Sequence, residues 1–215
     1  ISSSNKKHTA LVEVEGIIAS ESEASADKII TGLRAAFKDE NTAGVIIRIN
    51  SPGGSPVQAG YINDEINRLR DKYKDRKLPI YAVVTDLCAS GGYYIAVAAD
   101  QIYADKASVV GSIGVLMDSF GFVGSLEKLG IERRLLTAGE HKGFLDPFSP
   151  MKEDEVKHVK EVLSQIHDQF VATVKQGREK SLKAKNQLKL LENATLFSGL
   201  VWTGEQAVEL GLIDG

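Results

Sequence analysis

The sequence lacks a long apolar run, an excess of positive charge and a second cysteine. A membrane span needs roughly 18 consecutive apolar residues, whereas the longest uninterrupted run here is Tyr93–Ala99. A net charge of −3 gives no electrostatic basis for binding nucleic acid. Cys88 has no partner for an internal disulfide, so we expect it to be a small, buried packing residue. These absences argue against a nucleic-acid-binding protein and a disulfide-stapled domain.

The composition is that of a globular protein with one main core. Of the 215 residues, 43% are hydrophobic and 26% are charged, which suffices for a single sizeable domain. Residues 1–8 are polar and begin without Met, so we expect a linker truncated from an anchoring segment. Residues 9–150 are expected to form an α/β core. Residues 151–215, where the composition changes, are expected to be a helical C-terminal part of the same domain.

Short apolar runs alternate with amphipathic segments along the chain. This alternation, with short loops between, predicts an α/β fold with a mainly parallel sheet. The solid apolar run at 43–50 is typical of a central strand covered on both faces. Strands are expected at 9–19, 43–50, 79–85, 101–104, 109–117 and 133–137, and helices at 24–39, 57–73, 93–99, 122–129, 151–185 and 203–211.

Ser90 stands at a predicted strand-to-helix turn, in the sequence Cys-Ala-Ser-Gly-Gly. Such a turn can present a hydroxyl outward, and the glycines after it let a substrate backbone come close. The free N–H groups of the new helix would lie where negative charge develops on an attacked carbonyl. The pattern predicts a nucleophilic serine, although Ser90 lacks the Gly-x-Ser-x-Gly elbow of the α/β-hydrolases.

A serine hydroxyl needs a base to take its proton, and the sequence offers histidine or lysine. His8, His158 and His167 lie in polar or charged segments and are expected to be solvated. His141 follows a predicted strand in a glycine-containing loop, and Lys142 is next to it. A lysine has a normal pKa near 10.4 and becomes a base only when burial lowers that pKa by several units. Spacing alone leaves both residues open.

A second turn, Asn50–Gly54, follows the predicted strand at 43–50. A glycine pair after a buried strand is by itself an ordinary turn. If it lies on the same sheet edge as Ser90, it could supply a second N–H group to an oxyanion hole.

Six segments together resemble the bacterial signal peptide peptidase A (protease IV) family, in its short single-domain form. Their order and spacing match from about Thr9 to the end of the chain. The segments are Arg48–Gly54, Ala89–Tyr94, Val110–Val115, Glu140–Lys142, Trp202–Ala207 and Gly211–Asp214. The Ser-Pro-Gly-Gly turn alone is shared with Clp proteases and the wider crotonase superfamily.

The resemblance implies a Ser-Lys dyad, with Ser90 as nucleophile and Lys142 as general base. It implies that the backbone N–H groups of Gly54 and Gly91 form the oxyanion hole. It further implies that the Ser112 hydroxyl orients the lysine amine. The substrate is expected to contact Gly53 and an apolar set comprising Leu116, Met117 and Phe144.

The implied fold is crotonase-like or Clp-protease-like, with a twisted, mainly parallel sheet, outer helices and a long C-terminal helical segment. The resemblance implies an enzyme without metal or other cofactor that degrades hydrophobic peptides such as cleaved signal peptides. It also implies a homo-oligomeric ring, anchored by a segment absent here to the inner membrane of the bacterial envelope, with the catalytic domain on the extracytoplasmic side.

Three other functions fit parts of the sequence less well. A crotonase-type acyl-CoA hydratase or isomerase would use carboxylates, but the turn offers Ser90, with Asp86 before it. A Clp-like Ser-His-Asp peptidase would need a histidine about two dozen residues after Ser90, where Ser112 stands. A catalytically inactive membrane scaffold would be favoured if Ser90 or Lys142 were missing.

Overall fold

The computed structural model describes residues 6–215, so most of the predicted linker at 1–8 lies outside the described residues. The chain divides into two compact units. The first unit runs up to Gly114 and continues from Gln169 to Gly215, and the second unit is Val115–Asp168. Each unit is described by itself below.

The first unit is built on a six-stranded, mostly parallel sheet. The strand order is β1-β2-β3-β5-β6, and β4 pairs with β3 beside this path. Only the β5–β6 pairing is antiparallel among the described residues. This confirms the predicted α/β class. The strands are β1 (His8–Glu15), β2 (Thr42–Ser51), β3 (Ile80–Ala89), β4 (Gln101–Ala104), β5 (Val109–Gly111) and β6 (Val201–Thr203).

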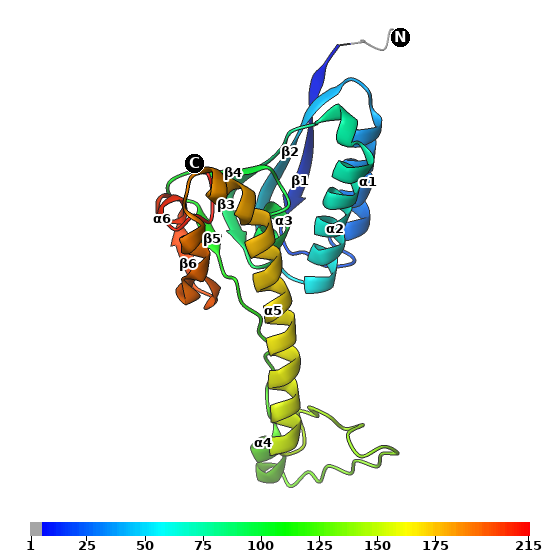
Figure 1. Ribbon diagram of the computed structural model, residues 1–215. Helices are drawn as coiled ribbons and strands as arrows, with labels where there is room; N and C mark the ends of the chain where they lie inside the picture. Colours follow the sequence, from blue (N-terminus) through cyan, green and yellow to red (C-terminus); the bar gives the residue numbers. More distant parts are fainter. Residues whose placement is uncertain (1–5) are drawn as a thin grey trace. The chain divides into compact units, whose positions relative to one another are not determined.

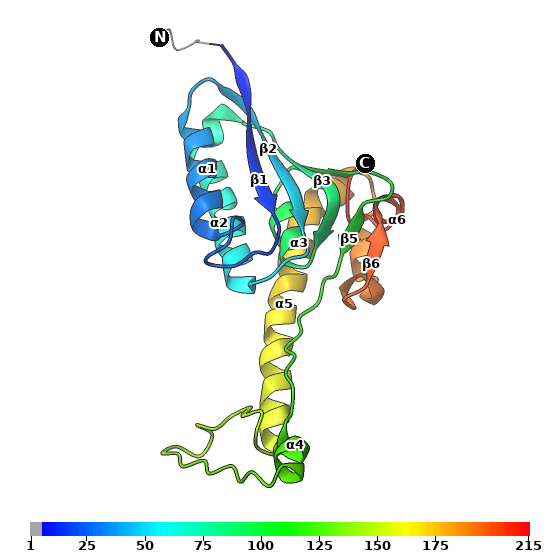
Figure 2. The ribbon, with the colours of Figure 1, turned by 180° about the vertical axis from the view of Figure 1, so that it is seen from behind.

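Two helices, α1 (Ala26–Lys38) and α2 (Pro56–Lys72), cover one face of this sheet (Figures 1 and 2). Val45, Ile47 and Ile49 of β2 alternate toward them and are fully buried. Arg48 points to the other face, where it is exposed and pairs with Glu13. The prediction that this strand is covered on both faces is therefore wrong, because its apolar run hides an alternation.

Further helices of the first unit follow its strands. Helix α3 (Gly91–Ala96) follows β3, and helix α6 (Gly204–Glu209) follows β6. Thr203 and Gln206 cap α6 reciprocally. The short helices η1 (Lys74–Arg76), η2 (Leu188–Glu192) and η3 (Ala194–Phe197), and strand β6, were not expected from the sequence.

Two predicted strands differ from the structure. The segment 109–117 forms a strand only as far as Gly111, because Gly111 and Ser112 both have positive φ and turn the chain away. The segment 133–137 forms no strand and is exposed, since a strand pattern without a neighbouring strand cannot complete its hydrogen bonds.

A buried ion pair ties the end of the chain to a long helix, α5 (Glu153–Ala184). The Arg178 side chain is 1% exposed and makes two hydrogen bonds to the Asp214 carboxylate, at 2.8 and 3.0 Å. Asp214 also accepts a hydrogen bond from the Ile102 amide at the start of β4. The predicted long helix is confirmed, and its C-terminal part is packed into the first unit.

The second unit contains the short helix α4 (Val123–Lys128) and the first half of α5, up to Asp168. Phe122 and Phe148 stack with ring centroids 5.5 Å apart, and Arg133 pairs with Asp146 at 3.2 Å. Most of its other apolar side chains are exposed: Leu116, Met117, Phe120, Leu129, Ile131, Leu135, Leu136, Phe144, Met151 and Val162.

Candidate active site

Ser90 lies where β3 gives way to α3, at the carboxyl edge of the parallel strands. Its backbone has φ 53° and ψ −121°, a conformation that a residue with a side chain rarely adopts. The Ser90 amide donates to Gly111 O at 2.8 Å, and its carbonyl accepts from the Tyr94 amide at 3.0 Å. Within residues 6–215 the structure shows no hydrogen-bond partner for the Ser90 hydroxyl. The turn is therefore rigidly held while its hydroxyl is unengaged.

The Gly53–Gly54 turn lies directly against the Ser90 turn. A Cβ atom added to Gly53 would stand 2.7 Å from the Ser90 Cβ and 2.6 Å from the Gly91 amide nitrogen. Gly53 also has φ +96°, which favours glycine. The two turns that the sequence singles out are thus neighbours, and only glycine fits between them.

Among the described residues, the backbone N–H groups of Gly54 and of Gly91, the first residue of α3, have no acceptor. The neighbouring Gly53 amide differs, because it donates to Ser51 Oγ at 3.1 Å. Free amide donors beside a hydroxyl are the arrangement that stabilises an oxyanion during acyl transfer.

Ser112 is connected to Ser90 through one peptide group. The carbonyl of Gly111 accepts the Ser90 amide, and the next residue, Ser112, donates its own amide to Leu200 O at 2.7 Å. Ser112 also has a positive φ, 54°. Two serines with strained backbones in one hydrogen-bonded chain mark a site where the fold holds side chains in defined positions.

The sequence does not reveal the residues that hold these turns. The Gly111 carbonyl accepts the Ser90 amide. The Ile18 amide donates to Gly53 O at 2.9 Å, and the Ile18 carbonyl accepts from the Ser55 amide at 2.8 Å. The Leu200 carbonyl, from the C-terminal part of the chain, accepts the Ser112 amide. These contacts are made by backbone atoms, so side-chain identity carries little signal for them.

Lys142 belongs to the second unit and lies in an exposed loop. Its amide donates to Gly139 O at 3.1 Å, which closes a turn. The next residue, Gly143, lies against Leu135, since an added Cβ would be 2.6 Å from a Leu135 methyl. Leu135 therefore contacts the residue that follows Lys142. Because Lys142 and Ser90 belong to different units, their pairing remains a prediction.

The histidines divide in the same way. His8 begins β1 and faces Asp39 at 3.6 Å, so it lies at the amino edge of the parallel strands, opposite to Ser90. In the second unit, His141 Nδ1 is 3.6 Å from Glu155, and His158 packs edge-on to the Phe144 ring. His167 lies on α5.

The residues proposed to contact substrate also come from both units. Gly53 lies in the first unit, as described above. Leu116, Met117 and Phe144 lie in the second unit and are 79%, 56% and 37% exposed. These side chains are exposed, and their role in substrate binding stays a prediction.

Cys88 is buried, and its thiol is not activated for nucleophilic attack. It lies in β3 with no exposed surface, and burial raises the pKa of its thiol well above the ordinary value. A raised pKa keeps the thiol protonated, so Cys88 is a packing residue and Ser90 is the candidate nucleophile of this turn.

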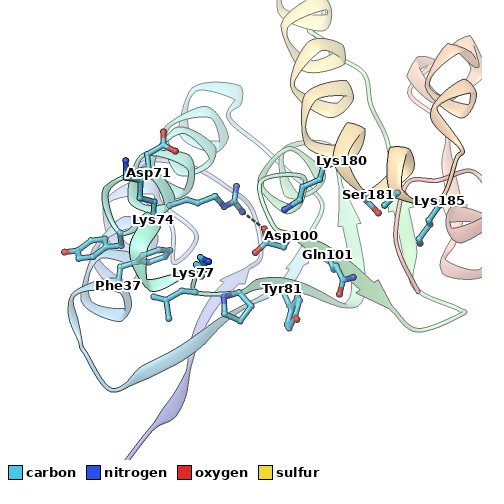
Figure 3. Close-up of a pocket in the computed structure, with 15 residues that line it drawn as sticks. Phe37, Asp71, Lys74, Lys77, Tyr81, Asp100, Gln101, Lys180, Ser181 and Lys185 are labelled. Carbon is cyan, nitrogen blue, oxygen red and sulfur yellow. Dashed lines mark ion pairs between the residues drawn. The ribbon is translucent and has the colours of Figure 1, made fainter.

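A cavity of about 830 Å³ lies at the other end of β3 (Figure 3). Arg70 pairs there with Asp100 at 3.4 Å, and Lys77 and Lys180 are also in its lining. Asp100 bonds the Ile80 amide at the start of β3, so this cavity is on the opposite edge of the sheet from Ser90. It is not part of the candidate active site.

Two further searches concern the described residues alone. No group of three or more His, Cys, Asp or Glu side chains in residues 6–215 is arranged to hold a metal ion. In the same residues, no helix has the length and apolar character needed to cross a membrane.

Comparison with known proteins yields one family and several relatives. Residues 72–215 match peptidase family S49. The chain is 46% identical over 183 residues to the Na(+)/H(+) antiporter NhaA of Brucella melitensis, a match covering 85% of this chain and 23% of that protein. It is 33% identical over 219 residues to the putative signal peptide peptidase SppA of Enterococcus faecium, covering 98% of this chain and 60% of that protein.

A third relative is a putative protease of Synechocystis. It is 30% identical over 211 residues, which cover 98% of this chain and 70% of that protein. The match to the protein named as an antiporter covers less than a quarter of that protein. The matches to the two proteins named as a peptidase or protease each cover more than half of the relative's length.

Proposed function

The chain belongs to peptidase family S49, and from this premise we propose that it is a serine endopeptidase with a Ser90–Lys142 dyad. The observation that supports this most strongly is the Ser90 turn. There a strained backbone, an unengaged hydroxyl and two unpaired amide N–H groups occur together. In a member of a peptidase family, this combination supports attack of Ser90 on a peptide carbonyl as the proposed chemistry.

The proposed reaction assigns a role to the Ser90 hydroxyl, to the Lys142 amine and to the two amide N–H groups. The Ser90 oxygen attacks the substrate carbonyl carbon, and its proton passes to the uncharged amine of Lys142. The amide N–H groups of Gly54 and Gly91 hold the oxyanion that forms. The Lys142 ammonium then protonates the leaving amine as the peptide bond breaks. A water molecule, deprotonated by the same amine, hydrolyses the acyl-enzyme and restores Ser90.

Lys142 must be uncharged when it accepts the proton, and in this structure its loop is exposed. We therefore propose that bound substrate or a neighbouring subunit removes water from the amine, with Leu135 forming part of the apolar wall. The Ser112 hydroxyl would then orient the amine toward Ser90.

The substrate class follows from the same surface and from the relatives. The relative from Enterococcus faecium is named as a signal peptide peptidase. The exposed apolar side chains of Leu116, Met117 and Phe144 suit an apolar peptide. We propose hydrophobic peptides such as cleaved signal peptides as substrates, and the extracytoplasmic side of the bacterial inner membrane as the place of action.

We also propose a homo-oligomeric ring. The second unit leaves many large apolar side chains in water, and Leu136 is 95% exposed. Exposed apolar surface of this extent is typical of interaction sites. Neighbouring copies would cover it and complete the substrate groove.

The test of the proposed function is labelling with a serine-reactive phosphonate, followed by mapping of the modified residue. We expect a single adduct on Ser90. We also expect Ser90→Ala to lose activity on a hydrophobic fluorogenic peptide by about 10⁴-fold or more. The variant should melt at the parent's temperature, because alanine removes one exposed oxygen. An active Ser90→Ala enzyme, or an adduct elsewhere, contradicts the proposal.

A further inference from the structure

Ser51 is a buried polar residue to which the proposed mechanism gives no part. It is the last residue of β2 and has no exposed surface. A buried hydroxyl is costly unless it is hydrogen-bonded, and this one is bonded in both directions. It donates to Gly16 O at 2.7 Å and accepts from the Gly53 amide at 3.1 Å.

These two bonds join the turn after β1 to the turn after β2. Gly16 directly follows β1, and its own amide donates to Asn50 O at 2.8 Å. Gly53 is the residue before the free N–H group of Gly54. The Ser51 hydroxyl therefore fixes the chain at the point where it enters the oxyanion turn.

The direction of the Gly54 N–H follows from its neighbours. Gly53 O accepts the Ile18 amide at 2.9 Å, and the C=O and N–H of a trans peptide point in opposite directions. The Gly54 N–H must therefore point away from Ile18. The Ser51 bond holds the preceding peptide, so together the two bonds set both peptide planes of the turn.

Resting on the function proposed above, we infer that Ser51 is a positioning residue that aims the Gly54 amide at the reacting carbonyl oxygen. Ser51 does not touch the substrate. Without its hydroxyl, the Gly53 amide loses its acceptor and the glycine pair gains rotational freedom. Loss of a whole oxyanion donor typically costs 10²–10³ in rate, and a misaimed donor costs part of that.

The experiment compares Ser51→Ala with Ser55→Ala, a hydroxyl deletion in the same turn. The Ser55 hydroxyl accepts from the Gln58 amide and caps α2, so its bond leads away from the site. For Ser51→Ala we expect kcat to fall about 10- to 100-fold, with KM within about threefold of the parent. For Ser55→Ala we expect kcat within about twofold and a lower melting temperature.

A second readout separates positioning from general distortion. A peptide aldehyde adds to Ser90 and forms an oxyanion, whereas the matching peptide alcohol binds without one. Ser51→Ala should weaken binding of the aldehyde by the same factor as it lowers kcat, and should leave binding of the alcohol unchanged. Equal weakening of both compounds, or a kcat within twofold of the parent, would overturn the inference.

Two controls keep the test decisive. If Ser51→Ala does not fold, Ser51→Cys retains the volume with a poor acceptor, and the same fall in kcat is expected. An unchanged kcat in folded Ser51→Cys contradicts the inference. If Ser90→Ala remains active, the proposed function itself fails. If Ser90→Ala is inactive while Ser51→Ala has the parent's kcat, only the role inferred for Ser51 is contradicted.

Discussion

The two units hold their proposed catalytic groups in different ways. Ser90 is fixed by backbone hydrogen bonds to Gly111 and Tyr94, at the end of a buried strand. Lys142 lies in an exposed loop held by local backbone bonds, from its own amide to Gly139 O and from the Phe144 amide to His141 O. The first unit therefore presents a preorganised nucleophile and oxyanion hole, while the second presents the base on a segment with few constraints. Substitutions that add atoms between the two turns of the first unit should therefore affect folding and chemistry together, whereas substitutions in the second unit should affect them separately.

The largest expected effect on folding is that of Gly53→Ala, which should also lower activity. The new methyl group would overlap the Ser90 Cβ and the Gly91 amide, at a φ of +96°. We expect a loss of about 3 kcal/mol in the free energy of unfolding and at least about 10²-fold in kcat.

Gly60→Ala is the matched control for this glycine. Gly60 lies in α2, and an added Cβ meets nothing within 4 Å. The free energy of unfolding of this variant should rise by up to about 1 kcal/mol, and the variant should keep full activity. Urea unfolding and peptide hydrolysis measure both variants. Equal behaviour of the two alanines would contradict the close approach of the two turns.

A smaller effect on stability is expected when acid protonates Glu65 in the first unit. Hydrogen bonds from Arg68 and then from Arg34, each at 2.7 Å, lower the pKa of this carboxyl from 4.5 to about 2. The folded pKa lies below the unfolded one. The stabilisation is therefore complete above about pH 4.5 and is lost as the pH falls toward 2.

Glu65→Gln should thus be less stable than the parent at pH 7, and the difference should shrink between pH 4.5 and 2. Urea unfolding followed by circular dichroism at several pH values measures this. Glu23→Gln, which removes an exposed ion pair with Lys28, is the control and should change stability little at any pH. A Glu65→Gln difference that stays constant with pH would show that the ion pairs do not stabilise the fold.

The smallest effect on folding is expected in the second unit. Leu136 is 95% exposed, so Leu136→Glu should change the free energy of unfolding of the subunit by less than about 0.5 kcal/mol. If copies of the chain cover this side chain, the same substitution should shift sedimentation from a species several-fold heavier than 23.3 kDa toward the monomer. Leu11→Glu, at an exposed leucine of the first unit, is the control. A parent that sediments only as a monomer with full activity contradicts the assembly.

The sequence predicts the first unit better than the second, for physical reasons. Ser90 and the Gly53–Gly54 pair stand next to apolar strand patterns, and parallel strands bring their carboxyl ends together. The Gly111 carbonyl and the strained backbone of Ser112 depend on tertiary backbone contacts that no side-chain pattern encodes. The segment 133–137 has the composition of a strand but has no partner strand, so local propensity was misleading there.

The most direct test of the account compares the activity of Lys142→Ala with that of His141→Ala. The two residues are adjacent in one exposed loop, so both variants change the same segment, and the His141 side chain lies 3.6 Å from the Glu155 carboxylate. We predict that Lys142→Ala loses at least about 10³-fold in kcat, while His141→Ala stays within about tenfold of the parent. An inactive histidine variant beside an active lysine variant would contradict the Ser-Lys mechanism and establish a Ser-His mechanism in its place.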